Sequence, residues 1–361
     1  PQRWSNELAL HVIELKTIEP VAELAPVVDL FQHDVRRINS ILEPMGARLL
    51  PTATHPWMNP HTELKLWPHE YNAVYESFHR IFDCTGHGWA NLQSTHINLP
   101  FANDDEFARL HAAIRVILPI LPALAASSPI MDAAVTGMAD TRLNVYRGNA
   151  RRVPSVSGRV IPERVFSRAA YEGELLAGLY RDIAPHDPDG ILQHEWLNAR
   201  GCIARFNRGA IEIRVLDIQE CPAADLAILA IIIETLRALV GERWINLEAL
   251  QRFEIDPLFE ILTNCIARGE RAEITDRDFL AAFGRDKPCT AAELWRHLRN
   301  ALLPRAGAWD RALDVILNEG TLSTRILRAT GPSPDRAVLR RVYSQLADCL
   351  HRGDPFLPAG A

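Results

Sequence analysis

The pattern of hydrophobic and polar residues predicts strands over residues 8–17, 47–52, 91–99 and 201–217. The two-residue alternation of a β-strand is present in the first, third and last of these stretches. The last one predicts a β-hairpin, because Asn207-Arg208-Gly209 at its centre tolerates the positive φ of a tight turn. Its second half, AIEIRVLD (residues 210–217), predicts a strand with one apolar face and one face that carries an acid and a base.

Helical spacing of apolar residues fills most of the remaining sequence. The pattern predicts helices over residues 22–44, 69–83, about 104–126 and 168–183, and a mostly helical segment over 222–349. The third of these helices should kink, since Pro119 and Pro122 lie inside it. Strands and helices alternate in the first two-thirds, and helices dominate the last third. This order is typical of an α+β fold with a largely antiparallel sheet.

Several predicted strands place chemically useful side chains together on their polar faces. The sets that share a face are Glu14 with Lys16, Ser94 with His96 and Asn98, and Glu212 with Arg214, while Arg205 alternates with Ala204 and Phe206. One interpretation is a half-exposed antiparallel sheet whose polar face meets water. The other is that these faces line a cleft.

A cleft built from these residues would suit a particular chemistry. Two carboxylates and an imidazole match the ligands of a hard divalent ion such as Mg²⁺ or Mn²⁺. Arginines beside them bind phosphate or carboxylate oxygens as a two-pronged donor. Both sets together favour phosphoryl transfer, in which the protein mainly positions and neutralises charge.

Composition narrows the class of protein. The chain has 361 residues and a net charge of −6, which gives no reason to expect a nucleic-acid or membrane partner. The longest apolar run, residues 226–233, is far shorter than the ~20 residues of a membrane span. Six scattered cysteines without a CxxC pair predict reduced core thiols of a cytoplasmic protein.

Six short motifs, in order along the chain, resemble the glutamate–cysteine ligase family 2, bacterial carboxylate–amine ligases of the glutamine synthetase superfamily. The matching segments are NELALHVIELKT (6–17), THPW (54–57), STHINL (94–99), ILPILPALAASSPI (117–130), DTR (140–142) and AIEIRVLD (210–217). The resemblance implies a curled, largely antiparallel sheet that forms an open funnel packed with helices. It also implies a catalytic core over residues 1–221 and a helical part, 222–361, packed on the same domain.

The resemblance further implies a reaction and a set of site residues. ATP would phosphorylate a glutamate-like carboxylate, and the amine of an amino acid would displace the phosphate to form an amide. The binding partners implied are therefore these small molecules, and the resemblance is also compatible with a homo-oligomer. The implied metal ligands for Mg²⁺ or Mn²⁺ are Glu14, His96, Glu212 and Glu7. The implied catalytic residues are Arg214, Arg142 and Arg205, and the implied cofactor-binding residues are Arg214, Arg205 and His55.

The sequence also departs from the family pattern. The family's first strand, with its Glu-x-Glu pair, has no counterpart, and we expect it to precede Pro1. The first His of the family's His-x-His strand is Ser94, so that only His96 carries over. Glu7 and Glu14, seven residues apart, would face opposite ways in one regular strand and converge only if the chain bends between them.

Two other functions are open at this point. The same carboxylates, imidazole and arginines could activate water in a metal-dependent amide hydrolase. Alternatively, the chain could be a degenerate, non-catalytic member of the family. The retained Glu14, His96, Glu212 and Arg214 favour an enzyme.

Overall fold

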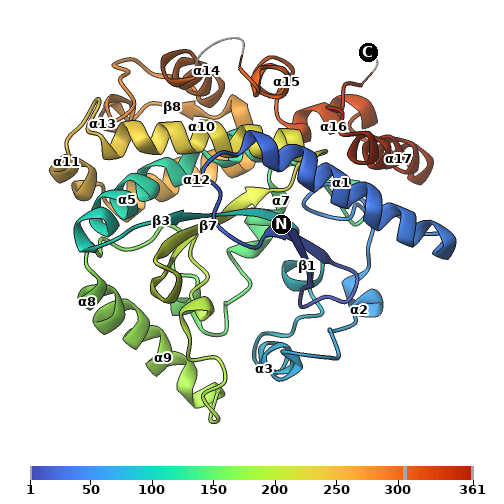
Figure 1. Cartoon of the computed structure of the whole chain (residues 1–361), viewed down its shortest axis with the longest axis horizontal. Coiled ribbons are helices and arrows are strands. Elements are labelled where there is room, and N and C mark those ends of the chain that lie inside the picture. The colour runs from blue at the N-terminus through green and yellow to red at the C-terminus, as the bar shows by residue number, and fades with distance from the viewer. Residues whose placement is uncertain (1, 304–306, 359–361) are drawn as a thin grey trace.

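The computed structural model describes residues 2–303 and 307–358 and shows an α+β fold (Figure 1). Its central element is a three-stranded antiparallel sheet in the order β3-β7-β6, formed by Ser94–Pro100, Ala210–Asp217 and Cys202–Arg205. The other sheets in the described part of the chain are two-stranded ribbons. They are β1–β2 (Gln2–Asn6, Ile13–Thr17), β4–β5 (Ile130–Met131, Ala134–Val135) and β8–β9 (Glu273–Ile274, Cys289–Thr290).

Three long helices cover the apolar face of the central sheet. They are α5 (Asp104–Ile117), α10 (Pro222–Val240) and α12 (Ile255–Arg268), and they lie above the sheet in Figure 1. Ile211, Ile213 and Val215 of β7 are buried and belong to the same apolar cluster as residues of these helices. Burying this face fixes the register of β7, because a one-residue slip would turn Glu212 and Arg214 into the core.

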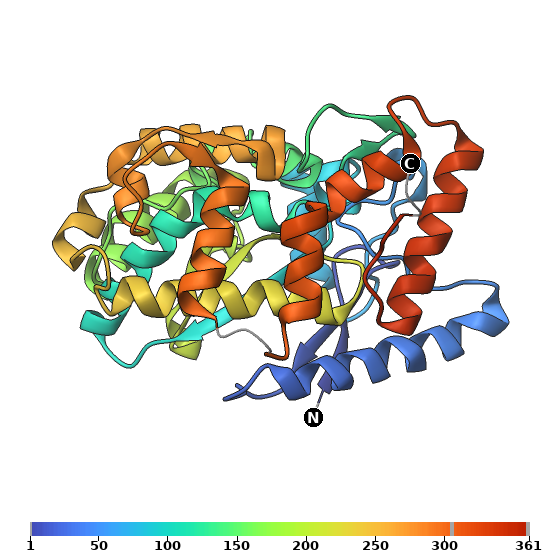
Figure 2. The same cartoon turned by 90° about the horizontal axis from the view of Figure 1, so that it is seen from above.

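The remaining helices surround this centre. Their bounds are α1 Ala25–Leu42, α2 Pro60–Glu63, α3 Asn72–Phe82, α4 His87–Ala90, α6 Pro122–Ala125, α7 Thr141–Tyr146, α8 Arg168–Ala170, α9 Ala177–Ile183, α11 Leu247–Arg252, α13 Arg277–Ala281, α14 Ala291–Leu302, α15 Asp310–Glu319, α16 Leu322–Thr330 and α17 Arg336–Arg352. Helices α1 and α17 lie side by side although they are far apart in sequence (Figure 2). The side chain of Gln32 on α1 donates to the backbone oxygens of Leu350 and His351 and so joins the two helices.

The hairpin and most helices match the sequence-based expectations. The predicted turn holds Gly209 at φ +58°, directly after a short 3₁₀ turn, Phe206–Arg208. The predicted helix over 104–126 is broken into α5, a 3₁₀ turn (Leu118–Ile120) and α6, with Pro119 and Pro122 each near the start of a new segment. A proline lacks the amide hydrogen that would continue the helix. The two prolines therefore interrupt the helix completely, where the sequence predicted only a kink.

Three expectations about strands are wrong. Residues 47–52 form no strand, and residues 8–17 contribute only β2, while residues 7–12 form a turn with a bridge between Ala9 and Leu66. The expected curled funnel sheet is not present in residues 2–303 and 307–358, whose strands belong to four small antiparallel sheets. Glu14 therefore does not share a sheet with His96 and Glu212, because β2 pairs with β1 and not with β3.

Two smaller findings concern membranes and thiols. No helix in the described ranges is both long and apolar enough to cross a bilayer. All six cysteines are free and buried, as expected for core thiols. Burial raises the pKa of the Cys84 thiol to about 12, so this cysteine is protonated and a poor nucleophile near neutral pH.

Candidate functional site: a polar cleft between two strand pairs

The polar face of the central sheet brings residues of β3 and β7 together. Asn98 is the register partner of Glu212, and the register shifts between Thr95 and Ile97, so that His96 lies in a bulge. A bulge re-aims a side chain and is common near functional sites. Here the His96 ring turns toward β7, and its Nδ1 lies 3.6 Å from Oε1 of Glu212.

Glu212 is the buried centre of this group. Its side chain is only 7% exposed, with Arg205 Nη1 at 3.3 Å from Oε2 and Arg214 Nε at 3.6 Å from Oε1. Burial alone would raise the pKa of Glu212, but the charges of Arg214, His96 and Arg205 outweigh it and hold this pKa below its ordinary range. Glu212 is therefore a carboxylate that stays ionised and organises the cations around it.

Arg214 lies where the cleft is still open, with 22% of its side chain exposed. Its Nη1 donates to the backbone oxygen of Asn198 at 3.2 Å. Desolvation would lower the pKa of Arg214, but Tyr146, Glu212 and Glu7 favour the charged form and raise it. The guanidinium is thus a permanent positive charge at the mouth of the site.

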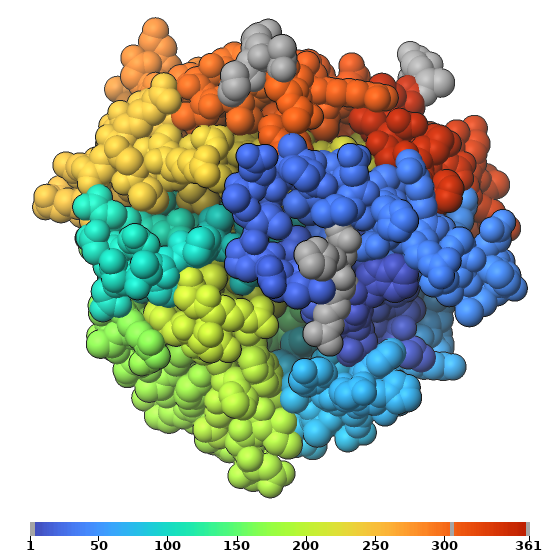
Figure 3. Space-filling model, in the orientation of Figure 1, coloured from blue at the N-terminus to red at the C-terminus, as the bar shows by residue number. Residues whose placement is uncertain are grey.

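His96 combines desolvation with access. Its Nε2 lies 2.8 Å from the hydroxyl oxygen of Ser94, and one-third (33%) of its side chain is exposed. Desolvation and the nearby charge of Arg214 lower the pKa of His96 to about 4. Figure 3 shows the molecular surface hollowed between the yellow-green segment near residue 200 and the blue N-terminal segments.

The β1–β2 ribbon adds two acids to this site. Glu14 accepts from Ser5 Oγ at 2.5 Å and pairs with Lys16 Nζ at 2.6 Å. Burial, and next the charge of Glu14, raise the pKa of Glu7, while Arg214 and Lys16 oppose this shift. Glu7 follows β1 whereas Glu14 lies in β2, so the chain turns between them. The expectation that they face opposite ways in one strand therefore does not apply.

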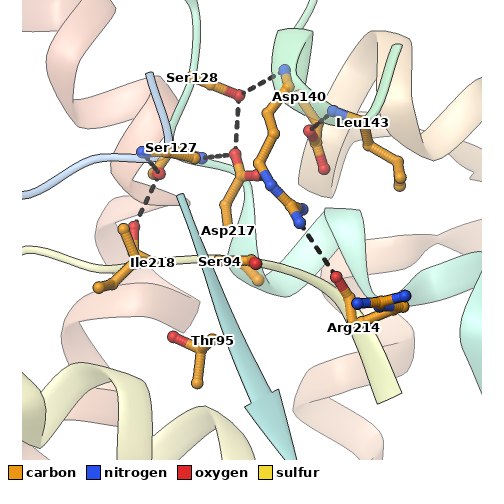
Figure 4. A network of polar contacts seen from close by, with 12 residues as sticks. Ser94, Thr95, Ser127, Ser128, Asp140, Leu143, Arg214, Asp217 and Ile218 are labelled. Atoms are coloured by element: carbon orange, nitrogen blue, oxygen red, sulfur yellow. Dashed lines mark hydrogen bonds and ion pairs between the residues drawn. The ribbon is translucent and has the colours of Figure 1, made fainter. Parts of the chain in front are cut away.

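Arg142 lies beneath the site and not in it. Its buried guanidinium contacts Asp217 Oδ1 at 3.5 Å and donates to the backbone oxygen of Arg214 at 3.0 Å. Asp217 also accepts from the backbone amide of Ser127 and the hydroxyl of Ser128, at 2.9 and 2.7 Å (Figure 4). This network fixes the end of β7 and with it the direction of Arg214.

Two buried acids complete this network. Burial, and next the charge of Asp217, raise the pKa of Asp140, and burial likewise raises the pKa of Asp217. Asp140 caps α7 by accepting from the backbone amide of Leu143 at 2.7 Å. Arg142 is thus a buried cation between two acids and has the environment of a positioning residue.

His55 belongs to a different group of contacts. Its backbone amide donates to Asn91 Oδ1 at 2.6 Å, and its ring packs edge-on against Trp57, 5.1 Å between centroids. Burial lowers the pKa of His55, and the charge of Glu63 opposes this shift. These contacts tie the loop 54–57 to Asn91, and they do not link His55 to Glu212.

The four predicted metal ligands do not form one cluster. Within residues 2–303 and 307–358, no group of three or more His, Cys, Asp or Glu side chains is placed to share an ion. Both oxygens of Glu212 already face cations. Glu7 and Glu14 fit a metal better. Burial and then the charge of Glu14 raise the pKa of Glu7, so the two carboxylates lie near each other, and Mg²⁺ commonly uses one or two carboxylates plus water and substrate phosphates.

Sequence reasoning missed three contributors to the site. Arg208, at the hairpin turn, lies close enough to lower the pKa of Glu212. Asp217 contacts Arg142, and Tyr146 favours the charged form of Arg214. The two residues of each pair are far apart in the sequence. The only sequence signal for them was the family motif that ends in Asp217. The Ser94–His96 contact could have been read from their shared strand face.

Comparison with known proteins adds the family. The model of the glutamate-cysteine ligase family 2 matches residues 2–345. An uncharacterized protein of Archaeoglobus fulgidus is 32% identical over 352 residues, which cover 98% of this chain and 88% of that protein. Family membership supports a ligase acting on small molecules. With a match over nearly its whole length and a cleft lined by the residues of the family motifs, the chain belongs to the glutamate-cysteine ligase family 2.

Proposed function

We propose that this chain is an ATP-dependent carboxylate–amine ligase of the glutamate–cysteine ligase type. It would activate the carboxylate of a glutamate-like amino acid as an acyl phosphate and join it to the amine of a second amino acid. The observation that carries the proposal is the cation cluster around Glu212. Arg205, Arg208 and Arg214 lie around the ionised carboxylate of Glu212, so several guanidinium groups line this part of the cleft.

These guanidinium groups suit the proposed reaction. A phosphoryl group in transfer spreads negative charge over its oxygens, and preorganised guanidinium donors stabilise it. Arg214 is the best candidate for this contact, because it is partly open to the cleft and its backbone is held by Arg142. Arg205 is more deeply buried, at 10% exposure, and would act with Glu212 to orient the bound carboxylate.

Mg²⁺ or Mn²⁺ and ATP complete the proposed site. Glu7 and Glu14 would hold the metal, which when bound supplies positive charge to the phosphates of ATP. Glu14 forms an ion pair with Lys16. Because this ion pair is exposed to solvent, breaking it to bind a metal costs little free energy. An enzyme that uses ATP and keeps six reduced thiols would work in the cytoplasm.

The test is phosphate release from ATP, measured with pairs of amino acids as carboxylate and amine. We expect release that requires both substrates and a divalent metal, and that stops with excess EDTA. The Glu7→Gln/Glu14→Gln double variant should need more metal for half-maximal rate, while Glu76→Gln on α3 serves as the matched control. Full activity in excess EDTA, or amide cleavage without ATP as the only reaction, would refute the ligase and favour a hydrolase.

A further inference from the structure

The strongest unassigned geometry in the molecule is a chain of three side chains in the cleft. The hydroxyl oxygen of Ser94 lies 2.8 Å from Nε2 of His96, and Nδ1 of His96 lies 3.6 Å from Oε1 of Glu212. We infer that Ser94, His96 and Glu212 form a nucleophile–base–acid triad that gives this cleft an acyl-transfer activity without ATP or metal. This inference concerns the same cleft as the ligase proposal but does not depend on it.

The fold places the three residues by simple strand geometry. Ser94 and His96 are two residues apart and so project from the same face of β3. The bulge at His96 turns its ring toward β7, where Glu212 points to the same face.

The roles of the atoms follow from their hydrogen-bonding capacity. An ionised carboxylate can only accept, so the proton of the neutral ring is placed on Nδ1, toward Glu212. Nε2 is then free to accept the hydroxyl hydrogen of Ser94. The 3.6 Å separation from Glu212 is longer than a hydrogen bond, and such contacts are often loose in ligand-free enzymes and tighten around substrate.

The acyl-transfer step balances with these groups alone. Oγ of Ser94 bonds to the carbonyl carbon while its proton passes to Nε2 of His96. The bond from that carbon to the leaving oxygen or nitrogen then breaks, and the leaving group takes the proton from Nε2. Water or an amine repeats the step in reverse, releasing the acyl group and returning the proton to Ser94. Arg214, whose Nε lies 3.6 Å from the same carboxylate and whose side chain is 22% exposed, would stabilise the intermediate oxyanion.

The cation cluster selects the substrate class. Arg205, Arg208 and Arg214 lie around Glu212, so an acyl group that carries its own carboxylate gains an ion pair that an uncharged one lacks. The structure therefore assigns an ester or amide of a dicarboxylic acid as the substrate. Access is open, because Ser94 is only half-buried and His96 exposes a third of its side chain.

The first test uses the wild-type chain with EDTA and no nucleotide. A fluorophosphonate probe should label one serine, and peptide mass mapping should find it at Ser94. The p-nitrophenyl monoester of glutarate should be hydrolysed faster than that of butyrate. Labelling elsewhere only, or no labelling, would overturn the triad, and because ATP is absent this result leaves the ligase proposal untouched.

The second test uses variants. Ser94→Ala and Ser94→His should lose the label and lower ester turnover by roughly 10³-fold or more, the scale for removing a triad nucleophile. The matched control is Ser40→Ala, since Ser40 is exposed on α1 and bonds only to the backbone oxygen of Arg37. Circular dichroism would confirm that both Ser94 variants are folded. Unchanged turnover in a folded Ser94→Ala chain would refute the inference.

Discussion

The β1–β2 ribbon and the central sheet each present a carboxylate beside a cation, but in opposite surroundings. On the ribbon, Glu14 and Lys16 are 34% and 44% exposed. In the sheet, Glu212 and Arg205 are 7% and 10% exposed. An exposed pair is worth little and opens easily, whereas a buried one cannot lose a partner without leaving a charge stranded. The ribbon is therefore suited to exchange ligands, and the sheet to hold fixed charges in place.

The largest expected effect removes the buried acid. Glu212→Ala leaves Arg205 and Arg214 without their shared carboxylate, and losing one partner of a buried ion pair costs about 3–5 kcal/mol. Glu14→Ala on the ribbon should cost no more than ~1 kcal/mol. Urea unfolding of both variants, followed by circular dichroism, measures this contrast. Equal losses in the two variants would mean that burial does not distinguish the ribbon from the sheet.

The second effect concerns catalysis at Arg214, on the middle strand of the central sheet. Arg214→Lys keeps one charge but loses the two-pronged donor, so we expect kcat of the ligase reaction to fall by roughly 10²-fold. Stability should change little, because the side chain faces the cleft. Arg181→Lys is the matched control, since Arg181 is exposed and its guanidinium contacts the carboxylate of the neighbouring Asp182. Full activity of Arg214→Lys would make β7 a scaffold only.

The contrast between the central sheet and the ribbon also explains which strands could be placed from the sequence alone. Residues 211–215 alternate strictly in a segment that lies between a turn and a helix, so local pattern was enough to place Glu212 and Arg214 on one face. The segment 8–17 also alternates, but its first half forms a turn that pairs with Leu66, and β2 pairs with the preceding strand. Alternation does not reveal which partner a short strand finds.

The buried network was beyond local pattern for a related reason. Arg142 was expected to bind an anion of the substrate, yet its partners are Asp217 and the backbone of Arg214, more than seventy residues away in sequence. An arginine has the same local sequence signature whether it binds a ligand or a buried carboxylate. Only the packing of α7 against β7 separates the two roles.

The smallest expected effect is a difference between the ribbon and the central sheet in how their acids make stability depend on pH. The pKa of Glu7 is raised above its ordinary value of 4.5, first by burial and then by Glu14, so the folded state holds this proton more tightly than the unfolded state. Its contribution to stability is therefore present at low pH and is lost as pH rises from about 4.5 through the folded pKa. Glu212 has a lowered pKa and must behave in the opposite sense, losing its contribution as pH falls.

Glu7→Gln removes the ribbon's part of this pH dependence. The free energy of unfolding of the wild type, measured in urea from pH 4 to 8 at fixed ionic strength, should fall relative to that of Glu7→Gln as pH rises above the ordinary value of 4.5. Mg²⁺ should offset this loss in the wild type, because an ion bound to the two acids favours their ionised forms and stabilises only the folded state. Parallel curves for the two proteins, with or without Mg²⁺, would show that Glu7 and Glu14 do not act as a crowded acid pair.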